Sequence, residues 1–174
     1  MRMSMGGRLL VAGILVWALV GCGSAVEGEA EPLSGQAGLF DPCTDIPDSA
    51  IRGVGLDPYT KEVDIAGVEM PGWKICTWSG GWYFVAIFSN IYSINDIRNN
   101  SEYGNLVDGS VGSRQGVMFT KVDDLDGDSC YIAAEVSQGS IWLRVNRKGL
   151  RAVEEPTCGL ARKYVDELED FWPH

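Results

Sequence analysis

The chain has 174 residues, with 14 lysines and arginines against 24 aspartates and glutamates. Its 45% apolar and 22% charged residues are typical of one globular domain and exclude a disordered or fibrous chain. The formal net charge of −10 argues against a nucleic-acid-binding protein, which needs a basic surface.

Residues 1–21 have the layout of a lipoprotein signal peptide. Two arginines precede an apolar run over residues 9–20, which is too short to span a bilayer comfortably. The sequence LVGC at 19–22 then resembles a bacterial lipobox, in which the cysteine thiol receives a diacylglyceryl group. We therefore expect a fatty-acyl anchor on Cys22 that holds the protein at the outer face of the cytoplasmic membrane. The alternative is a plain signal peptide, cut near residues 21–25, in which Cys22 has no role.

Residues 22–38 have the composition of a flexible acidic tether. They are rich in glycine, alanine, serine and glutamate and contain no basic residue. A mature chain beginning at Cys22 carries 12 basic and 24 acidic residues, a net charge of −12. Because an anionic membrane surface repels such a domain, we expect the folded part, residues 39–174, to stand away from the membrane.

The folded part contains four cysteines, an even number that predicts two disulfides in an exported chain. Of the three possible pairings, we favour Cys43–Cys76 and Cys130–Cys158, since each joins sequence neighbours. A zinc site is a poor alternative, because there is no C-x-x-C spacing and the single histidine, His174, is the last residue. We expect no cofactor.

The periodicity of the apolar residues predicts a sheet flanked by helices. Residues 82–88 are apolar on both faces, which is typical of a central strand covered on both sides. Residues 61–69 alternate weakly and are read as a strand or an ordered loop. Helices are expected at 47–52, at 93–99 and from 156 onward, and strands at 73–78, 82–89, 106–110, 115–122, 130–136 and 141–146. The predicted fold class is α+β, an antiparallel sheet packed with helices in a single small disulfide-stapled domain.

Two of these elements carry a prediction about exposure. Strand 141–146 alternates, so Trp142, Arg144 and Asn146 are expected on a face open to water. The last helix has an apolar stripe that runs from Ala161 to Trp172 and includes Phe171.

Four tryptophans are the candidates for a binding surface: Trp73, Trp78, Trp82 and Trp142. The first three crowd one hairpin, where they either pack the sheet against a helix or line a ligand groove. Trp142, on the predicted polar face, is the better candidate for an exposed contact with another protein. Exposed tryptophans would favour a partner surface, and tryptophans that line a cavity would favour a ligand.

One acidic cluster, residues 123–128, has the sequence DDLDGD. Asp124, Asp126 and Asp128 are candidate calcium ligands, but the glycine and the glutamate of an EF-hand loop are out of place. A solvated Asp-Gly turn between two strands is the preferred interpretation.

No catalytic constellation is present in the sequence. A histidine at the chain end provides no Ser-His-Asp or Cys-His arrangement, and no glycine-rich phosphate loop occurs. We expect a non-enzymatic module that binds or senses another envelope protein. The alternative is a carrier of a small ligand or lipid, with a cleft between sheet and helix, and a hydrolase is a distant third.

Several short motifs occur together along the chain: FDPCTDIP at 40–47, GLDP at 55–58, WKICTW at 73–78, CYI at 130–132 and PTC at 156–158. With these motifs, residues 40–172 resemble the actinobacterial lipoprotein family catalogued as domain of unknown function 3558. The resemblance implies a secreted, lipid-anchored domain with paired cysteines, and it implies no activity.

Overall fold

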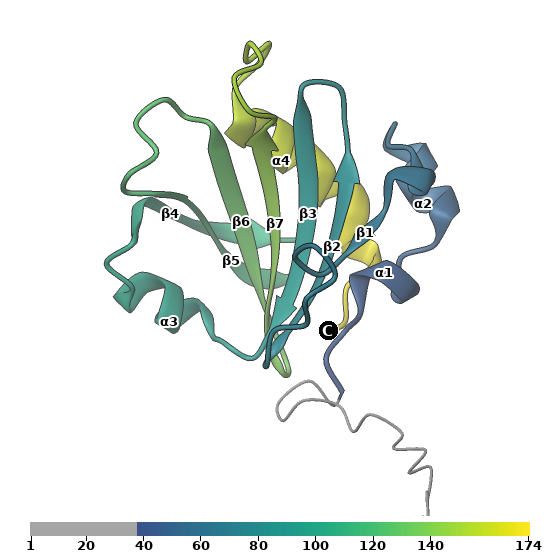
Figure 1. Cartoon of the computed structure of the whole chain (residues 1–174). Coiled ribbons are helices and arrows are strands. Elements are labelled where there is room, and N and C mark those ends of the chain that lie inside the picture. The colour runs from purple at the N-terminus through teal and green to yellow at the C-terminus, as the bar shows by residue number, and fades with distance from the viewer. Residues whose placement is uncertain (1–37) are drawn as a thin grey trace, which may run out of the picture. The chain divides into compact units, whose positions relative to one another are not determined.

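A seven-stranded antiparallel sheet organises residues 38–174, the part of the chain that the computed structural model describes (Figure 1). The spatial order is β1-β2-β3-β7-β6-β5-β4. The strands are β1 Glu62–Val63, β2 Trp73–Ser79, β3 Tyr83–Asn90, β4 Tyr103–Val111, β5 Arg114–Lys121, β6 Ser129–Val136 and β7 Gly139–Arg147. The helices are α1 Pro42–Asp45, α2 Asp48–Gly53, α3 Ile94–Asn99 and α4 Thr157–Leu168, with 3-10 turns at Pro58–Thr60 and Glu169–Phe171.

β3 is an interior strand next to β7, the middle strand of the sheet, and its two apolar faces predict such a position. It pairs with β2 on one side and β7 on the other, and Val85, Ala86 and Ile87 are fully buried. Alternate residues of β3 therefore contribute to two separate cores, one on each face of the sheet. The predicted α+β fold with an antiparallel sheet is confirmed.

The back core lies between the sheet and α4, which is behind the strands in Figure 1. α4 buries one stripe, Leu160, Ala161, Tyr164, Val165 and Leu168, against β6 and β7. The prediction for Phe171 is wrong. The α-helix ends at Leu168 and the 3-10 turn changes the periodicity, so Phe171 is 39% exposed whereas Trp172 is buried.

The front core lies under α3, a short helix with a complete capping box. The Ser93 side chain accepts a hydrogen bond from the Asp96 backbone N–H, and the Asp96 carboxylate accepts one from the Ser93 N–H. Ile94 and Ile97 are the buried residues of α3, and they pack with Phe119, Tyr131 and other front-face side chains.

Both expected disulfides are present. Cys43–Cys76 joins α1 to β2, and Cys130–Cys158 joins β6 to the first turn of α4. Among the described residues, no helix is long and apolar enough to cross a bilayer.

The structure decides one stretch that the sequence left open and extends one predicted strand. Of residues 61–69, only Glu62–Val63 form a strand, and the remainder is loop. β4 is longer than the predicted 106–110, and its register against β5 shifts between Gly104 and Val107. Weak alternation gave no signal for where β1 ends, because both of its side chains are exposed.

Candidate functional site

The front face of the sheet carries a trough with an aromatic floor, between α3 and the loop of residues 64–72. Three adjoining hollows make up this aromatic trough, with volumes of about 320, 250 and 270 Å³. The lower hollow lies against α3 and the upper hollow lies near Asn146. The lower and central hollows share Trp73, Tyr103 and Trp142 as walls, and the central and upper hollows share Ile65 and Arg144.

Trp142 of β7 is at the centre of the aromatic floor. Its ring contacts Trp73, Phe119 and Tyr103 edge to face, with centroids 5.3, 5.5 and 5.9 Å away. Its indole N–H donates to the Ser140 hydroxyl at 2.6 Å. Edge-to-face geometry and a satisfied indole N–H fix this ring rigidly, so the floor is preformed.

The structure separates the four candidate tryptophans into two pairs. Trp73 and Trp142 meet in the trough, whereas Trp78 and Trp82 are 1% and 6% exposed in the back core. The expectation that Trp142 is exposed is wrong, because it is only 5% exposed. Alternation within one strand did not show that Trp73 and α3 cover this face.

Arg144 is two residues beyond Trp142 on the same face of β7. Its guanidinium carbon is 5.1 Å from the Phe88 ring centroid and 5.9 Å from that of Tyr131. Its Nε is buried without a hydrogen-bond partner, and no ion pair among residues 38–174 includes Arg144. Arg147, on the same strand, pairs with Asp128. The face of β7 that was predicted to be open to water is half-buried at Arg144 and Asn146.

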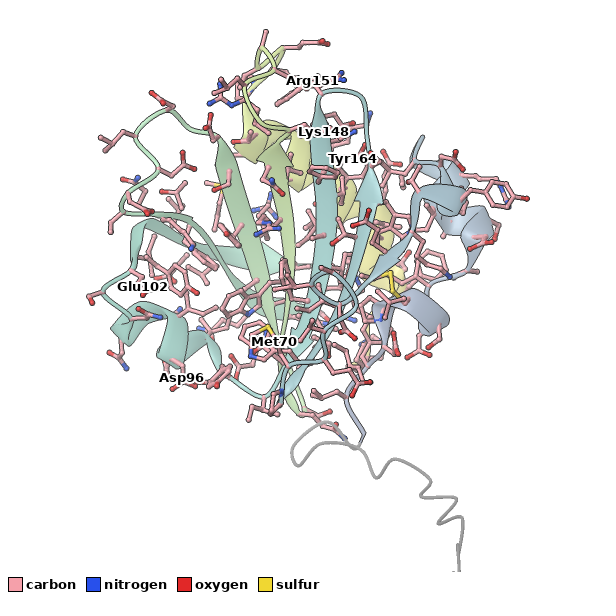
Figure 2. The ribbon with its side chains drawn as sticks, viewed as in Figure 1. Met70, Asp96, Glu102, Lys148, Arg151 and Tyr164 are labelled. Atoms are coloured by element: carbon pink, nitrogen blue, oxygen red, sulfur yellow. A yellow bond between two sulfur atoms is a disulfide. The ribbon has the colours of Figure 1, made fainter. Side chains whose placement is uncertain are left out.

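The loop of residues 64–72 crosses the front of the sheet, where Figure 2 shows Met70. Asp64 and Ala66 have positive φ values of 57° and 53°, which is uncommon for residues other than glycine. Ile65 and Met70 contribute to the wall of the central hollow. The loop therefore presents apolar side chains to the trough and leaves them partly in water.

Tyr103 is partly buried in the wall shared by the lower and central hollows, and this burial affects its phenol. Burial raises the pKa of the Tyr103 phenol above its usual value, and nearby Tyr131 and Glu102 raise it further. Asp96, on the rim beside α3, has a lowered pKa because Ser93 donates hydrogen bonds to its carboxylate. At neutral pH the rim at α3 is thus anionic and the floor is neutral.

The acidic cluster forms the turn between β5 and β6. The Asp124 carboxylate accepts from the backbone N–H groups of Asp128 and Ser129 at 2.8 and 2.7 Å, and Asp128 pairs with Arg147. Asp124 and Asp128 are therefore engaged with internal donors, while Asp126 is exposed. Within residues 38–174, no group of three or more His, Cys, Asp or Glu side chains is arranged to hold a metal ion.

Sequence reasoning missed the tyrosines of the trough and the role of Arg144. Tyr103 of β4 and Tyr131 of β6 lie on either side of β5. The Phe119 ring of β5 contacts both, with centroids 4.8 and 5.0 Å away, so the pairing of three strands brings the two tyrosines together. The alternation in β7 did place Arg144 on the same face as Trp142, and this was the one sequence signal that connected Arg144 with the trough. The predicted lipidation site Cys22, the predicted signal peptide and all but the last residue of the predicted tether lie outside the described residues.

Fold and site define a small disulfide-stapled α+β domain with an aromatic trough on one face of its sheet. Residues 17–170 match the family described as protein of unknown function (DUF3558), and the chain belongs to this family. Comparison with curated proteins gave no significant match, and comparison with solved structures gave none either. Two disulfides are typical of a domain outside the cytoplasm.

Proposed function

We propose that this protein is a lipid-anchored, non-enzymatic domain of the actinobacterial cell envelope that binds a small apolar ligand in its aromatic trough. One observation carries the proposal: Trp73 and Trp142 belong to the front core and also line the open volume of two adjoining hollows. Of the two functions that the sequence left open, this geometry favours the ligand carrier over the partner surface.

The size and lining of the trough suit such a ligand. Small-molecule sites occupy roughly 300–1,000 Å³ and combine apolar walls with a few polar groups. The lower hollow alone has about 320 Å³, and the central hollow adjoins it along three aromatic walls. Both are open to solvent at the rim, so a ligand can enter without unfolding of the sheet.

The lipobox resemblance at Cys22 and the acidic tether support an anchored position at the outer face of the cytoplasmic membrane. The two disulfides are consistent with this compartment. An anchor would hold the trough within reach of molecules that leave or enter the membrane. Labelling of growing cells with a fatty-acyl analogue tests the anchor. Wild-type protein should be labelled and Cys22→Ser should not, and an unlabelled wild type or a labelled variant would refute the anchor.

Binding of N-phenyl-1-naphthylamine, a neutral apolar fluorophore, tests the trough. We expect its fluorescence to rise on the wild-type protein, with energy transfer from tryptophan. Trp73→Ala removes a wall shared by two hollows and should weaken probe binding by about tenfold, since a large aromatic contact area is lost. Tyr59→Ala is the matched control, because Tyr59 is 89% exposed and does not line the trough. Equal loss in both variants, or no binding by the wild type, would refute the proposal.

A partner protein is the second candidate function. The exposed apolar side chains of Val63, Ile65 and Val68, which are 53%, 55% and 63% exposed, favour it. Crosslinking on intact cells that recovers a reproducible partner, abolished by Val68→Asp, would support this function.

A further inference from the structure

We infer that the aromatic trough binds a single-chain amphiphile with a carboxylate head group, which pairs with Arg144 while the chain lies along the floor toward α3. This inference rests on the proposed function and names its ligand class. It is carried by a half-buried cation that forms no ion pair among residues 38–174, at one end of an aromatic floor.

Arg144 differs from the other partly buried arginines of the described domain. Arg114 donates to Glu169 and to two backbone carbonyls, and Arg147 pairs with Asp128. The Nε of Arg144 and the Nε of Arg147 are both buried without a hydrogen-bond partner. Arg147 has a counter-charge in Asp128, whereas Arg144 forms no ion pair among residues 38–174. Contacts with the rings of Phe88 and Tyr131 compensate part of the lost hydration, but a ring face accepts no planar pair of hydrogen bonds. A carboxylate provides that pair of acceptors.

The charge distribution along the trough assigns the head group to the central hollow. Two cationic side chains, Arg144 and Lys121, line this hollow, and no acidic side chain does. Beyond Arg144, the upper hollow has Glu62 and Asp64 in its wall, which repel an anion. Two cations in one hollow are notable on a chain whose formal net charge is −10.

The same distribution orients the ligand. The lower hollow has one carboxylate, Asp96 on its rim, and its lowered pKa keeps it anionic at neutral pH. An anionic head group is therefore unfavourable there, whereas an alkyl chain gains contact with the partly exposed rings of Trp73, Tyr92 and Tyr103. The ligand thus lies with its chain at α3 and its head group at Arg144.

The test compares decanoate with 1-decanol, which share a chain and differ in head-group charge, as competitors of the neutral fluorophore. The protein is the mature-length chain carrying Cys22→Ser, so that no lipid is attached. At pH 7 and below micelle-forming concentrations, we expect decanoate to bind at least about tenfold more tightly than decanol, which is the contribution of a charge-assisted hydrogen bond.

Arg144→Met keeps most of the apolar length of the side chain and removes the charge, so it should abolish the preference for decanoate and leave decanol binding unchanged. Arg151→Met is the matched control for net charge, because Arg151 is exposed and lies at the far end of the domain from Met70 (Figure 2). Urea unfolding of each variant checks that the fold is retained.

Three results would overturn the inference. Equal affinity of wild-type protein for decanoate and decanol would do so and leave the proposed function standing, and this comparison needs no variant. Retention of the preference in Arg144→Met would assign the head group elsewhere. Failure of the fluorophore and both competitors to bind would overturn the proposed function as well. If the protein is then a dimer, the trough is assigned to a second copy of the chain.

Discussion

Removal of the Cys130–Cys158 bridge by the double substitution Cys130→Ala and Cys158→Ala tests how the last helix is held. The bridge joins β6 to the first turn of α4 across a sequence separation of 28. In the chain-entropy description, a crosslink of this span stabilises the domain by about 3.6 kcal/mol at 25 °C, because it restricts the unfolded chain. For a domain of this size, that corresponds to a fall in Tm of about 12 °C.

α4 should remain docked in this variant, since Leu160, Tyr164 and Leu168 are buried independently of the bridge. The far-ultraviolet circular dichroism of the native state should thus be unchanged, and the loss should be seen in the urea midpoint. The Cys43–Cys76 bridge spans a separation of 33 and gives about 3.7 kcal/mol by the same relation. The two double variants are therefore each other's control, with nearly equal losses expected. A loss below about 1 kcal/mol for either, or a difference between them above about 2 kcal/mol, would refute the reasoning from loop length.

Two further predictions concern the turns around the front face. Gly139 has a φ of 129°, and an added Cβ would lie 2.1 Å from the Asn90 carbonyl oxygen. Gly139→Ala should therefore lower the free energy of unfolding in urea by at least about 1–3 kcal/mol. Gly109→Ala is the control: its Cβ meets nothing within 4 Å, so it should change that free energy by less than about 0.5 kcal/mol. The side-chain hydrogen bond from Ser93 lowers the pKa of Asp96 below 3.8, so the capping box contributes its full stability above pH 3.8 and loses it as the pH falls through the lowered value. Carboxyl NMR titration should show the Asp96 pKa rising toward 3.8 in Ser93→Ala, and an unchanged value would contradict the assigned cause.

Local features of this fold were readable from the sequence because their causes are local. The capping residues at Ser93 and Asp96 act within one turn of chain, and the two-sided apolar pattern of residues 82–88 belongs to one strand. The cysteine pairing was also predicted correctly, since it follows here from proximity along the chain. Residue type alone made Trp73 and Trp142 candidates for the binding surface.

Only the tertiary structure decided which face each tryptophan serves. Whether Trp142 is exposed depends on Trp73, which belongs to another strand, and on α3, whose position depends on the register of the whole sheet. The same holds for Arg144: its residue type predicts a surface cation, and its lack of a partner is a property of the surrounding strands. Phe171 departs from its helical stripe because α4 gives way to a 3-10 turn after Leu168. Patterning thus determined most of the elements, whereas the burial of both faces of β7 and the trough itself depend on side chains that only long-range packing brings together.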